Sequence, residues 1–283
     1  MTILVTGATG QVGRHVVTGL AAVGEPVRAM TRQPSFRQAG VEVAYGDLLR
    51  PETVPFDDVR ALYLFPEPRT AREVVRRAVE AGVARIVTLS SGAVTAGLDT
   101  DFQLPVEQAV EASGCAWTHL RPGEYASNSL KLWGPSIRDE RVVRWHNPDW
   151  RGLPIHEADI AAVAVAALLG NGHHGRAYDL TGPARVSARE QVAAIADALG
   201  EEVRLEEVTP AAARAILERQ GGWAAANAAF LTGFEAYSPG TMPELTAEEW
   251  DDALAPLPTV AEILGRPART YREWARDHVA DFR

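Results

Sequence analysis

The sequence predicts an α/β protein with a doubly wound parallel sheet, followed by a smaller C-terminal α/β lobe. The first observation is that short runs rich in Val, Ile and Leu alternate with segments of helical periodicity up to about residue 121. The second is that the first run, Ile3–Thr6, leads through a glycine-rich turn directly into a helical pattern. Strands that alternate with helices build a parallel sheet, because each connection between parallel strands has to cross over the sheet.

Periodicity and end signals define the elements of this first region. The first helix, Val12–Val23, repeats apolar residues at helical spacing and stops at Gly24, a common helix C-terminal residue. A second helix, Thr70–Ala81, stops in the same way at Gly82, and a third covers Pro105–Ser113. The six strands expected here are Ile3–Thr6, Pro26–Thr31, Val41–Tyr45, Ala61–Phe65, Arg85–Ser90 and Trp117–Arg121.

The pattern changes beyond residue 121. Residues 122–154 are rich in Trp, Pro, Asn and Gly and lack clean periodicity, and residues 221–247 carry no assignable pattern. Ser187 and Glu190 have the spacing of a capping box at the start of a helix. The expected elements are helices Asp159–Leu169, Ala188–Leu199, Pro210–Gln220, Thr259–Leu264 and Thr270–Phe282, and strands Ala177–Thr181 and Val203–Val208.

Composition excludes several classes of protein. The 283 residues are 46% hydrophobic and carry a formal net charge of −9, which disfavours binding to nucleic acid or to an anionic membrane. The single cysteine, Cys115, precludes an internal disulfide and makes a structural zinc site implausible, so we expect no metal. The longest apolar stretch, Ile160–Leu169, has about half the length needed to cross a bilayer. We therefore expect a soluble, cytoplasmic protein.

The glycine-rich turn, TGATGQVG at Thr6–Gly13, carries the strongest functional signal in the chain. Gly7 permits the tight turn after the strand, Gly10 lets a phosphate approach the backbone, and Gly13 lets the helix pack closely. The helix N-terminus then directs free amide groups and the positive end of its dipole toward the anion. This arrangement predicts a pyrophosphate cradle for a dinucleotide. The alternative is an ordinary glycine-rich turn between strand and helix.

The GxxGxxG spacing and later motifs resemble the NmrA-like group of atypical short-chain dehydrogenases, and within it the bacterial NADPH-dependent quinone oxidoreductase type. The motifs are TGATGQVG at Thr6–Gly13, TRQP at Thr31–Pro34, GD at Gly46–Asp47, SSG at Ser90–Gly92, HLRPGEYASN at His119–Asn128, HEADIA at His156–Ala161 and YDLTGP at Tyr178–Pro183. The resemblance implies a Rossmann-like NAD(P)-binding domain. The cofactor-binding residues expected from it and from position are Gly7, Thr9, Gly10, Gln11, Val12, Gly13, Arg32, Asp47, Leu48, Phe65, Pro66 and Ser90.

The end of the second strand favours NADP(H) over NAD(H). A carboxylate there would bind the ribose 2′-hydroxyl of NAD and repel the 2′-phosphate of NADP, but the chain has Thr31 and Arg32 with no acidic residue nearby. An arginine fork suits a phosphate dianion. The alternatives are that Arg32 is a solvated loop residue and that Asp47 is a turn residue rather than an adenine contact. NAD(H) stays a second choice.

The active-site pair of the wider superfamily is missing. Typical short-chain dehydrogenases carry Tyr-x-x-x-Lys on the helix after the fifth strand, whereas residues 101–108 read DFQLPVEQ. Two interpretations follow: an oxidoreductase that passes hydride from NADPH to a quinone-like or conjugated electrophile, or a non-catalytic NADP(H)-binding redox sensor. A third is a reductase or isomerase of specialised metabolism that acts on a polycyclic intermediate.

The catalytic and substrate-pocket candidates lie beyond the carboxyl ends of the strands, where open α/β sheets bind substrates. Ser91 follows the fifth strand and can hydrogen-bond a carbonyl oxygen; its alternative role is to cap a turn. Tyr125 and Asn128 follow the sixth strand, and Tyr125, the only phenol near this edge, is the fallback candidate for a general acid. Its alternative role is an aromatic pocket wall. His119, inside the sixth strand, is expected to be a core residue.

These expectations divide the chain into two parts. Residues 1–121 and 155–182 form the NAD(P)-binding domain, and residues 122–154 and 183–283 form the smaller substrate-binding lobe. We expect a small-molecule substrate and no nucleic-acid or membrane partner. A homodimer is left open by the sequence.

Overall fold

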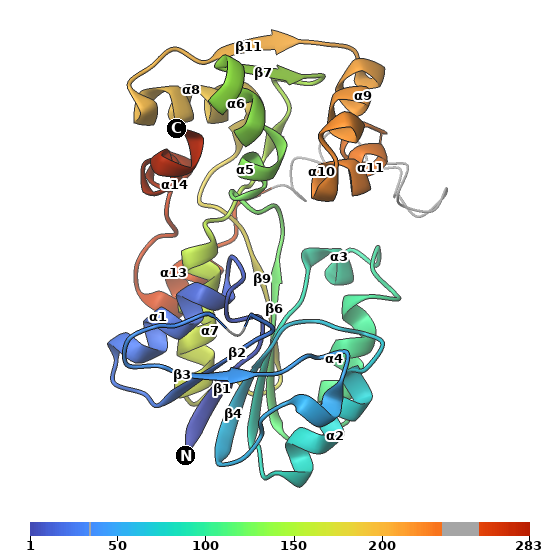
Figure 1. The fold of residues 1–283 in the computed structure, drawn as a ribbon, viewed down its shortest axis with the longest axis vertical. Helices are drawn as coiled ribbons and strands as arrows, with labels where there is room; N and C mark the ends of the chain where they lie inside the picture. The colour runs from blue at the N-terminus through green and yellow to red at the C-terminus, as the bar shows by residue number, and fades with distance from the viewer. Residues whose placement is uncertain (34, 234–254) are drawn as a thin grey trace. The chain divides into compact units, whose positions relative to one another are not determined.

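The computed structural model describes residues 1–33, 35–233 and 255–283, and it divides into two compact units (Figure 1). The first, here called the sheet domain, comprises Met1–Gly123, Glu157–Leu180 and Thr259–Pro267. The second, the small lobe, comprises Glu124–His156, Thr181–Pro258 and Ala268–Arg283. The segment Thr259–Pro267 was expected in the small lobe, but its helix α13 (Thr259–Leu264) packs against a helix and a strand of the sheet domain.

The sheet domain contains one seven-stranded parallel sheet in the order β3-β2-β1-β4-β5-β6-β9, so the predicted doubly wound fold is confirmed. The strand order reverses between β1 and β4, and in doubly wound sheets ligands bind at the carboxyl ends of the strands at such a switch point. The strands are β1 (Thr2–Val5), β2 (Val27–Thr31), β3 (Glu42–Tyr45), β4 (Val59–Leu64), β5 (Arg85–Leu89), β6 (Ala116–Pro122) and β9 (Arg176–Leu180).

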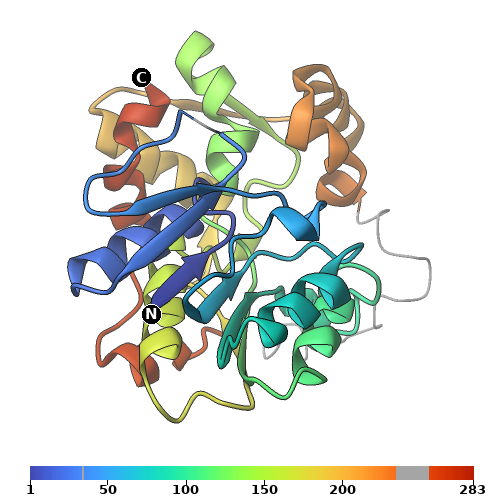
Figure 2. The same cartoon turned by 60° about the horizontal axis from the view of Figure 1, so that its bottom comes forward.

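Helices cover both faces of this sheet (Figures 1 and 2). Helices α1 (Gly13–Ala22) and α7 (Glu157–Leu169) pack against each other on one face. Helices α2 (Ala71–Glu80) and α4 (Gln103–Glu111) pack against each other on the other. The short helix α3 (Gly92–Thr95) and the 3-10 turn η1 (Pro51–Thr53) follow β5 and β3.

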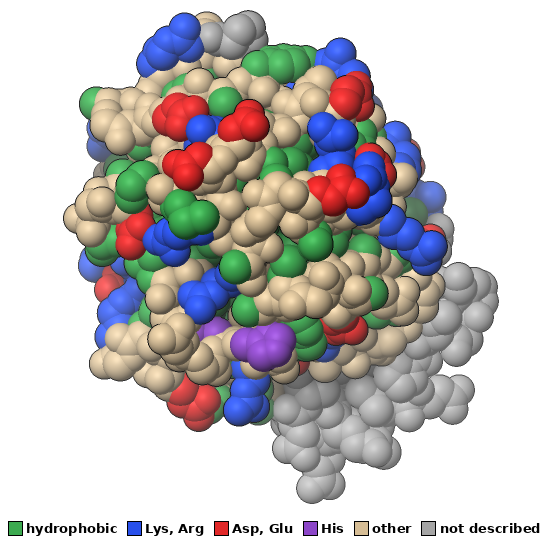
Figure 3. Space-filling view, turned by 90° about the horizontal axis from the view of Figure 1, so that it is seen from below, with side chains coloured by type: hydrophobic (Ala, Val, Ile, Leu, Met, Phe, Trp, Pro, Cys, Tyr) green, Lys and Arg blue, Asp and Glu red, His purple; other side chains and the backbone are tan. Residues whose placement is uncertain are grey.

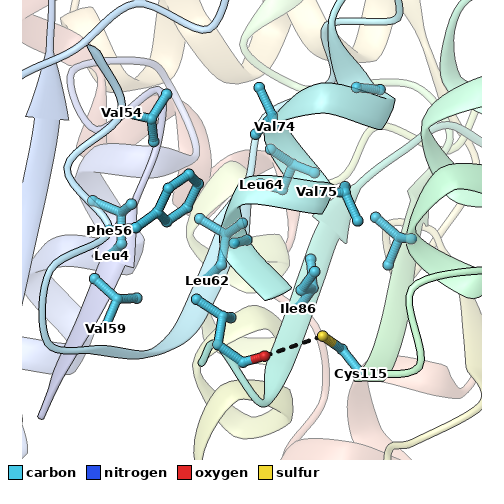
Figure 4. Packing of buried hydrophobic residues seen from close by; sticks show 14 of the residues in the cluster. Leu4, Val54, Phe56, Val59, Leu62, Leu64, Val74, Val75, Ile86 and Cys115 are labelled. Atoms are coloured by element: carbon cyan, nitrogen blue, oxygen red, sulfur yellow. Dashed lines mark hydrogen bonds between the residues drawn. The ribbon is translucent and has the colours of Figure 1, made fainter. Parts of the chain in front are cut away.

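An apolar core fills the space between the sheet and helices α2 and α4 (Figure 4). Leu4, Leu62 and Ile86 of three neighbouring strands are fully buried there. Cys115 joins this cluster, and its Sγ donates a hydrogen bond of 3.1 Å to the carbonyl oxygen of Val83. Burial in apolar surroundings makes Cys115 a packing residue of this core.

The small lobe contains two short pairs of strands. β7 (Val142–Trp145) pairs in parallel with β11 (Arg204–Glu207), and β8 (Arg151–Gly152) pairs antiparallel with β10 (Val186–Ser187). Its helices are α5 (Asn128–Leu132), α6 (Gly134–Glu140), α8 (Ala188–Leu199), α9 (Pro210–Gln220), α10 (Gly222–Ala226), α11 (Ala228–Gly233) and α14 (Tyr271–Asp277), with the 3-10 turn η2 (Val279–Phe282). Of residues 221–247, which gave no pattern, 222–233 form α10 and α11, and 234–247 lie outside the described residues.

Local signals located α8 accurately. The Ser187 side chain accepts the Glu190 amide, the Glu190 side chain accepts the Ser187 amide, and the helix ends at Gly200. The irregular segment 122–154, by contrast, contains α5, α6, β7 and β8, none of which was expected. Elements of two to seven residues are too short for a hydrophobic period to repeat.

The tryptophans of the small lobe divide into core and surface residues. Trp133 is buried and packs edge-on against Trp145, with ring centroids 5.8 Å apart. Trp150 and Trp223 are 49% and 37% exposed. Trp133 and Trp145 therefore pack in the core of the small lobe, whereas Trp150 and Trp223 lie at its surface.

Surface charge and helix length concern which partners the protein could have. On the face seen in Figure 3, acidic and basic side chains lie among one another. No helix in the described part of the chain is both long and apolar enough to cross a membrane.

Candidate functional site

The cradle predicted at residues 7–13 forms between β1 and α1. Gly7 adopts a positive φ of 59°, and its carbonyl oxygen accepts the Gly10 amide at 2.9 Å. A Cβ on Gly13 would lie 2.1 Å from that same oxygen, so only glycine fits at the first residue of α1. Within the described structure, the amides of Gln11 and Val12 donate to no protein acceptor. Two free donors at a helix N-terminus are what a pyrophosphate requires.

Phe65 flanks the cradle from the carboxyl end of β4. The buried Thr6 hydroxyl donates to the Tyr63 carbonyl oxygen at 3.0 Å and accepts the Phe65 amide at 2.7 Å, which fixes the end of β4 against β1. The Phe65 ring lies close to Gly7, where an added Cβ would be 3.3 Å from ring atoms Cγ and Cδ2, yet Phe65 is 45% exposed. An exposed ring beside a phosphate cradle offers a face for stacking a planar ligand group. Pro66, the next residue, is buried.

Arg32 projects from the carboxyl end of β2. The Thr31 hydroxyl accepts the Gln33 amide at 3.0 Å and so shapes the turn, and Arg32 is exposed. Within the part of the chain that the structure describes, the Arg32 side chain forms no hydrogen bond or ion pair. Arg28, on the same strand, is already paired with Glu42 at 2.7 Å. An open depression of about 410 Å³ beside this turn is lined by Thr31, Gln33, Arg37, Gln38, Val41, Val43, Ala44 and Tyr45.

Asp47 and Leu48 follow β3 in a compact loop. Asp47 Oδ1 accepts the Leu49 amide at 3.0 Å, and Oδ2 lies 3.6 Å from Arg50. The turn alternative for Asp47 is therefore realised, and an adenine contact would have to share its carboxylate. The Leu48 carbonyl oxygen accepts the Thr70 hydroxyl at 2.6 Å, and its side chain packs on the core.

The two serines after β5 point in different directions. Ser90 is 3% exposed, its amide donates to the Leu120 carbonyl oxygen at 2.7 Å, and its hydroxyl lies toward the Glu107 carboxylate. Ser91 caps α3, because its Oγ accepts the Ala93 amide at 3.1 Å. The capping alternative is thus realised. A hydroxyl that accepts a backbone amide keeps its own proton for donation, so the cap does not exclude a role toward a carbonyl oxygen.

A charged network occupies the place of the missing Tyr/Lys pair. Arg121 Nε and Nη2 donate to both oxygens of Glu107, at 3.0 and 2.6 Å, across α4 and β6. Arg121 Nη1 donates to Thr95 Oγ1 at 3.1 Å, and Thr95 Oγ1 donates to Asp179 Oδ1 at 2.6 Å. Burial opposes ionisation of Glu107, but hydrogen bonds from Arg121 and Ser90 outweigh it and lower its pKa. The pair is therefore fully charged at neutral pH.

His119 is a core residue, as expected. Its ring is fully buried, stacks on Trp117 at 4.6 Å between centroids, and burial lowers its pKa to about 4. Ligand atoms of His119, Glu107 and Glu111 lie within 4.8 Å of one another. Both Glu107 oxygens are engaged by the Arg121 guanidinium, and a cation there would face that positive charge. These residues do not fit a metal.

The remaining candidates belong to the small lobe. Asn128 begins α5, and its backbone amide donates a hydrogen bond to the Tyr125 carbonyl oxygen at 3.1 Å. Tyr125 forms a bridge with Ile155, and burial raises the pKa of its phenol well above the usual value. No lysine lowers that pKa, because the only lysine in the chain, Lys131, lies beside Trp223. The Tyr125 phenol is therefore suited to donate a hydrogen bond rather than to give up its proton.

Sequence reasoning missed Glu124. Its carboxyl packs so closely on Gly152 that a Cβ there would lie 1.9 Å from Oε2. Burial raises its pKa to about 7, against hydrogen bonds from Gln191 and the Leu153 backbone. A group with this pKa changes protonation near neutral pH. Nothing in the pattern around Glu124 distinguishes it from an exposed glutamate, because the partners lie 29 or more positions away.

The parallel sheet and its cradle define a dinucleotide-binding protein of the doubly wound α/β class. The model of the NAD(P)H-binding family matches residues 7–170. The chain belongs to this NAD(P)H-binding family, in its NmrA-like branch of atypical short-chain dehydrogenases. The resemblance expected from the sequence is thereby confirmed.

Two relatives match along their whole length. The chain is 40% identical to (4-alkanoyl-5-oxo-2,5-dihydrofuran-3-yl)methyl phosphate reductase of Streptomyces griseus, over 99% of each chain. It is 32% identical to an NAD(P)H azoreductase of Xenophilus azovorans, again over 99% of each. The crystal structure of Escherichia coli NADPH-dependent quinone oxidoreductase in complex with NADPH has the same fold, with a TM-score of 0.75 at 24% identity, covering 98% of this chain and 99% of that one.

Proposed function

We propose that this protein is an NADPH-dependent reductase that delivers hydride to a small conjugated electrophile, such as a quinone or an unsaturated lactone. The observation that carries the proposal is an intact cradle in a chain whose helix α4 holds Glu107 in place of the Tyr/Lys pair. Relatives that match over 99% of the chain reduce a dihydrofuranone phosphate and an azo compound. In all of these acceptors, conjugation spreads the charge that hydride transfer creates.

The residues divide the work of such a reaction. When bound, the reduced nicotinamide supplies the hydride. Gln11 and Val12 offer backbone amides to the pyrophosphate, and Phe65 offers a face to a planar ring. Ser91 retains a hydroxyl proton that can stabilise developing charge on a carbonyl oxygen.

The reduction adds a hydride and one proton, and the proton needs a source. The Tyr125 phenol has a raised pKa, which makes it a poor acid, so we assign it hydrogen bonding to the substrate, with Asn128 beside it. A delocalised anion is a weak base that water can protonate. The chain therefore needs to supply position and polarity rather than a strong acid.

NADP(H) is the preferred cofactor in this proposal. Arg32 is exposed at the end of β2, where a 2′-phosphate would lie, and its guanidinium has no described partner among the described residues. Arg37 lines the depression beside the turn that carries Arg32. A second cation there would add to the preference for a phosphate dianion.

The relative at 40% identity favours one substrate class within the proposal. Its name specifies an unsaturated five-membered lactone that carries an acyl group and a phosphate. Conjugate addition of hydride to such a ring, followed by protonation of the enolate, saturates one C=C bond. An acyl-substituted butenolide is therefore the candidate substrate from specialised metabolism, and we propose to assay it together with simple quinones.

The test is the decay of NADPH absorbance with a panel of quinones, azo dyes and acyl-butenolides. Turnover of any of them, slowed about tenfold or more by Ser91→Ala, supports a reductase whose acceptor lies near Ser91. Thr18→Val, on the exposed face of α1, serves as the control that should leave turnover unchanged. NADPH binding by tryptophan quenching without any turnover would contradict the reductase and support a redox sensor.

A further inference from the structure

Helix α3 is too short and too exposed to hold itself in place. It has four residues, none of them buried, so apolar packing contributes little to its position. A helix of one turn is unstable alone, because nucleation costs more than its few hydrogen bonds return. Yet Ser91, the residue that we place next to the substrate carbonyl, caps this helix. Something else must fix α3.

Polar contacts to two strands supply that constraint. The single hydroxyl of Thr95, the last residue of α3, accepts Arg121 Nη1 of β6 at 3.1 Å and donates to Asp179 Oδ1 of β9 at 2.6 Å. Arg121 is itself immobilised, because Glu107, 1% exposed, takes two more of its donors. Thr95 is thus joined to the interior through one buried pair.

The other end of α3 rests on the backbone of β6. A Cβ on Gly92 would lie 3.6 Å from the Pro122 carbonyl oxygen, which is ordinary contact distance. Gly92 has no such atom, so this proximity supplies no directional contact to the helix. Among the side-chain hydrogen bonds of α3 in the described structure, those of the Thr95 hydroxyl link the helix to both β6 and β9, since this group is both donor and acceptor.

We propose that Thr95 is a positioning residue, which clamps α3 between Arg121 and Asp179 and so holds the Ser91 hydroxyl toward the substrate. The inference rests on the proposed function, because it assigns Ser91 a role in that reaction. Displacement of a donor by about 1 Å is enough to lower the rate substantially. Loss of the clamp should therefore reduce kcat and leave cofactor binding intact, since the cradle belongs to β1 and α1.

The variant Thr95→Val keeps the shape of the side chain and removes its hydroxyl, whereas Thr95→Ser keeps the hydroxyl. We expect T95V to lower kcat about tenfold, with the Kd for NADPH changed less than about twofold, and T95S to recover most of the rate. The control T18V removes an exposed hydroxyl of α1 and should match the wild type. A normal kcat in T95V would overturn the inference.

A double-mutant cycle separates positioning from general destabilisation. If Thr95 acts through Ser91, then T95V should cost less than about twofold in a Ser91→Ala background, because coupled residues are not additive. An unchanged tenfold loss in that background would overturn the coupling.

Amide hydrogen exchange makes the test independent of turnover. The clamp predicts faster exchange in the peptide that spans residues 91–97 of T95V but not of T95S, with the sheet amides unaffected. Faster exchange in T95V, combined with a wild-type protein that turns over no substrate, would contradict the proposed function and keep the clamp. Unchanged exchange in a protein that does turn over would overturn the clamp and keep the function.

Discussion

The cradle and the segment around Ser91 occupy the same edge of one sheet, yet they are built in opposite ways. The cradle spans seven consecutive residues, Gly7 to Gly13, and uses backbone groups and space. The Ser91 segment depends on side chains from α3, α4, β6 and β9, whose positions span Thr95 to Asp179. Cofactor binding is therefore encoded locally, whereas the handling of the acceptor is encoded by contacts between distant elements.

The two regions should also respond differently to mutation. Steric requirements at the cradle leave no alternative residue, because backbone atoms cannot move out of the way. Single members of a network of charged side chains can be substituted, and the substitution then changes the stability or the rate. The following predictions test this contrast.

The largest effect is expected for Gly13→Ala. The added Cβ would lie 2.1 Å from the Gly7 carbonyl oxygen, so the cradle must open. We expect the Kd for NADPH to rise about a hundredfold or more, measured by fluorescence titration. Gly19→Ala on the same helix is the control, because its Cβ would meet only the Val165 side chain, at 3.1 Å. Equal losses in both variants would contradict a steric cradle.

The next effect is expected for Glu107→Gln. Without the carboxylate, the Arg121 guanidinium has no charged partner, and its side chain is only 19% exposed. This loss should lower the free energy of unfolding by about 2–4 kcal/mol at pH 7. The pKa of Glu107 is lowered in the folded state, so its contribution is present above the ordinary value of 4.5 and lost as the pH falls. Denaturant titrations should therefore show the difference between E107Q and wild type shrinking in acid. A difference that is independent of pH would contradict the ion pair.

Arg32→Ala sharpens the account of the cofactor. Loss of the guanidinium should weaken NADPH about 10–100-fold and change NADH less than about twofold, because only NADPH carries the 2′-phosphate. Paired Kd measurements for the two cofactors check this. Arg50→Ala, beside Asp47, is the matched control for loss of an exposed arginine near the same strands. Equal weakening of NADPH and NADH in R32A would remove the phosphate assignment.

Glu124→Gln should have the opposite pH signature to E107Q. The pKa of Glu124 is raised from 4.5 to about 7, so its neutral form is stable below 4.5 and folding stability is lost as the pH rises toward 7. The uncharged glutamine avoids this loss and should stabilise the protein by about 1–2 kcal/mol at pH 8, and by nothing at pH 4. Thermal unfolding at the two pH values measures it. A destabilised E124Q at pH 8 would show that the folded protein favours the charged carboxylate, and would contradict a raised pKa for Glu124.

The smallest effect is expected for Asp47→Asn. The amide oxygen can still accept the Leu49 amide, so the turn survives. If Asp47 serves mainly the turn, the Kd for NADPH should change less than about threefold. A tenfold loss with unchanged Tm would instead identify the carboxylate as a cofactor contact.

Particular residues show how far the sequence could lead. Strands β1 to β6 and the α8 capping box were predicted because each signal lies within a few adjacent positions. Residues Thr259–Pro267 were assigned to the other unit, because no pattern in the adjacent sequence indicates that α13 packs on α7. The roles of Ser91 and Asp47 as turn residues were foreseen as alternatives, and their hydrogen bonds show that both residues fill them. Their roles toward substrate and cofactor stay predictions.

The sequence by itself determined the fold class, the family and the cradle, because hydrophobic period and glycine spacing are short-range properties that act before the chain is packed. Only the tertiary structure decided that Glu107 pairs with Arg121, that Thr95 joins Asp179, and that burial raises the pKa of Glu124 to about 7. The physical reason is that the energy of a charged or polar side chain depends on its burial and its partners. Both are set by residues that only folding brings together.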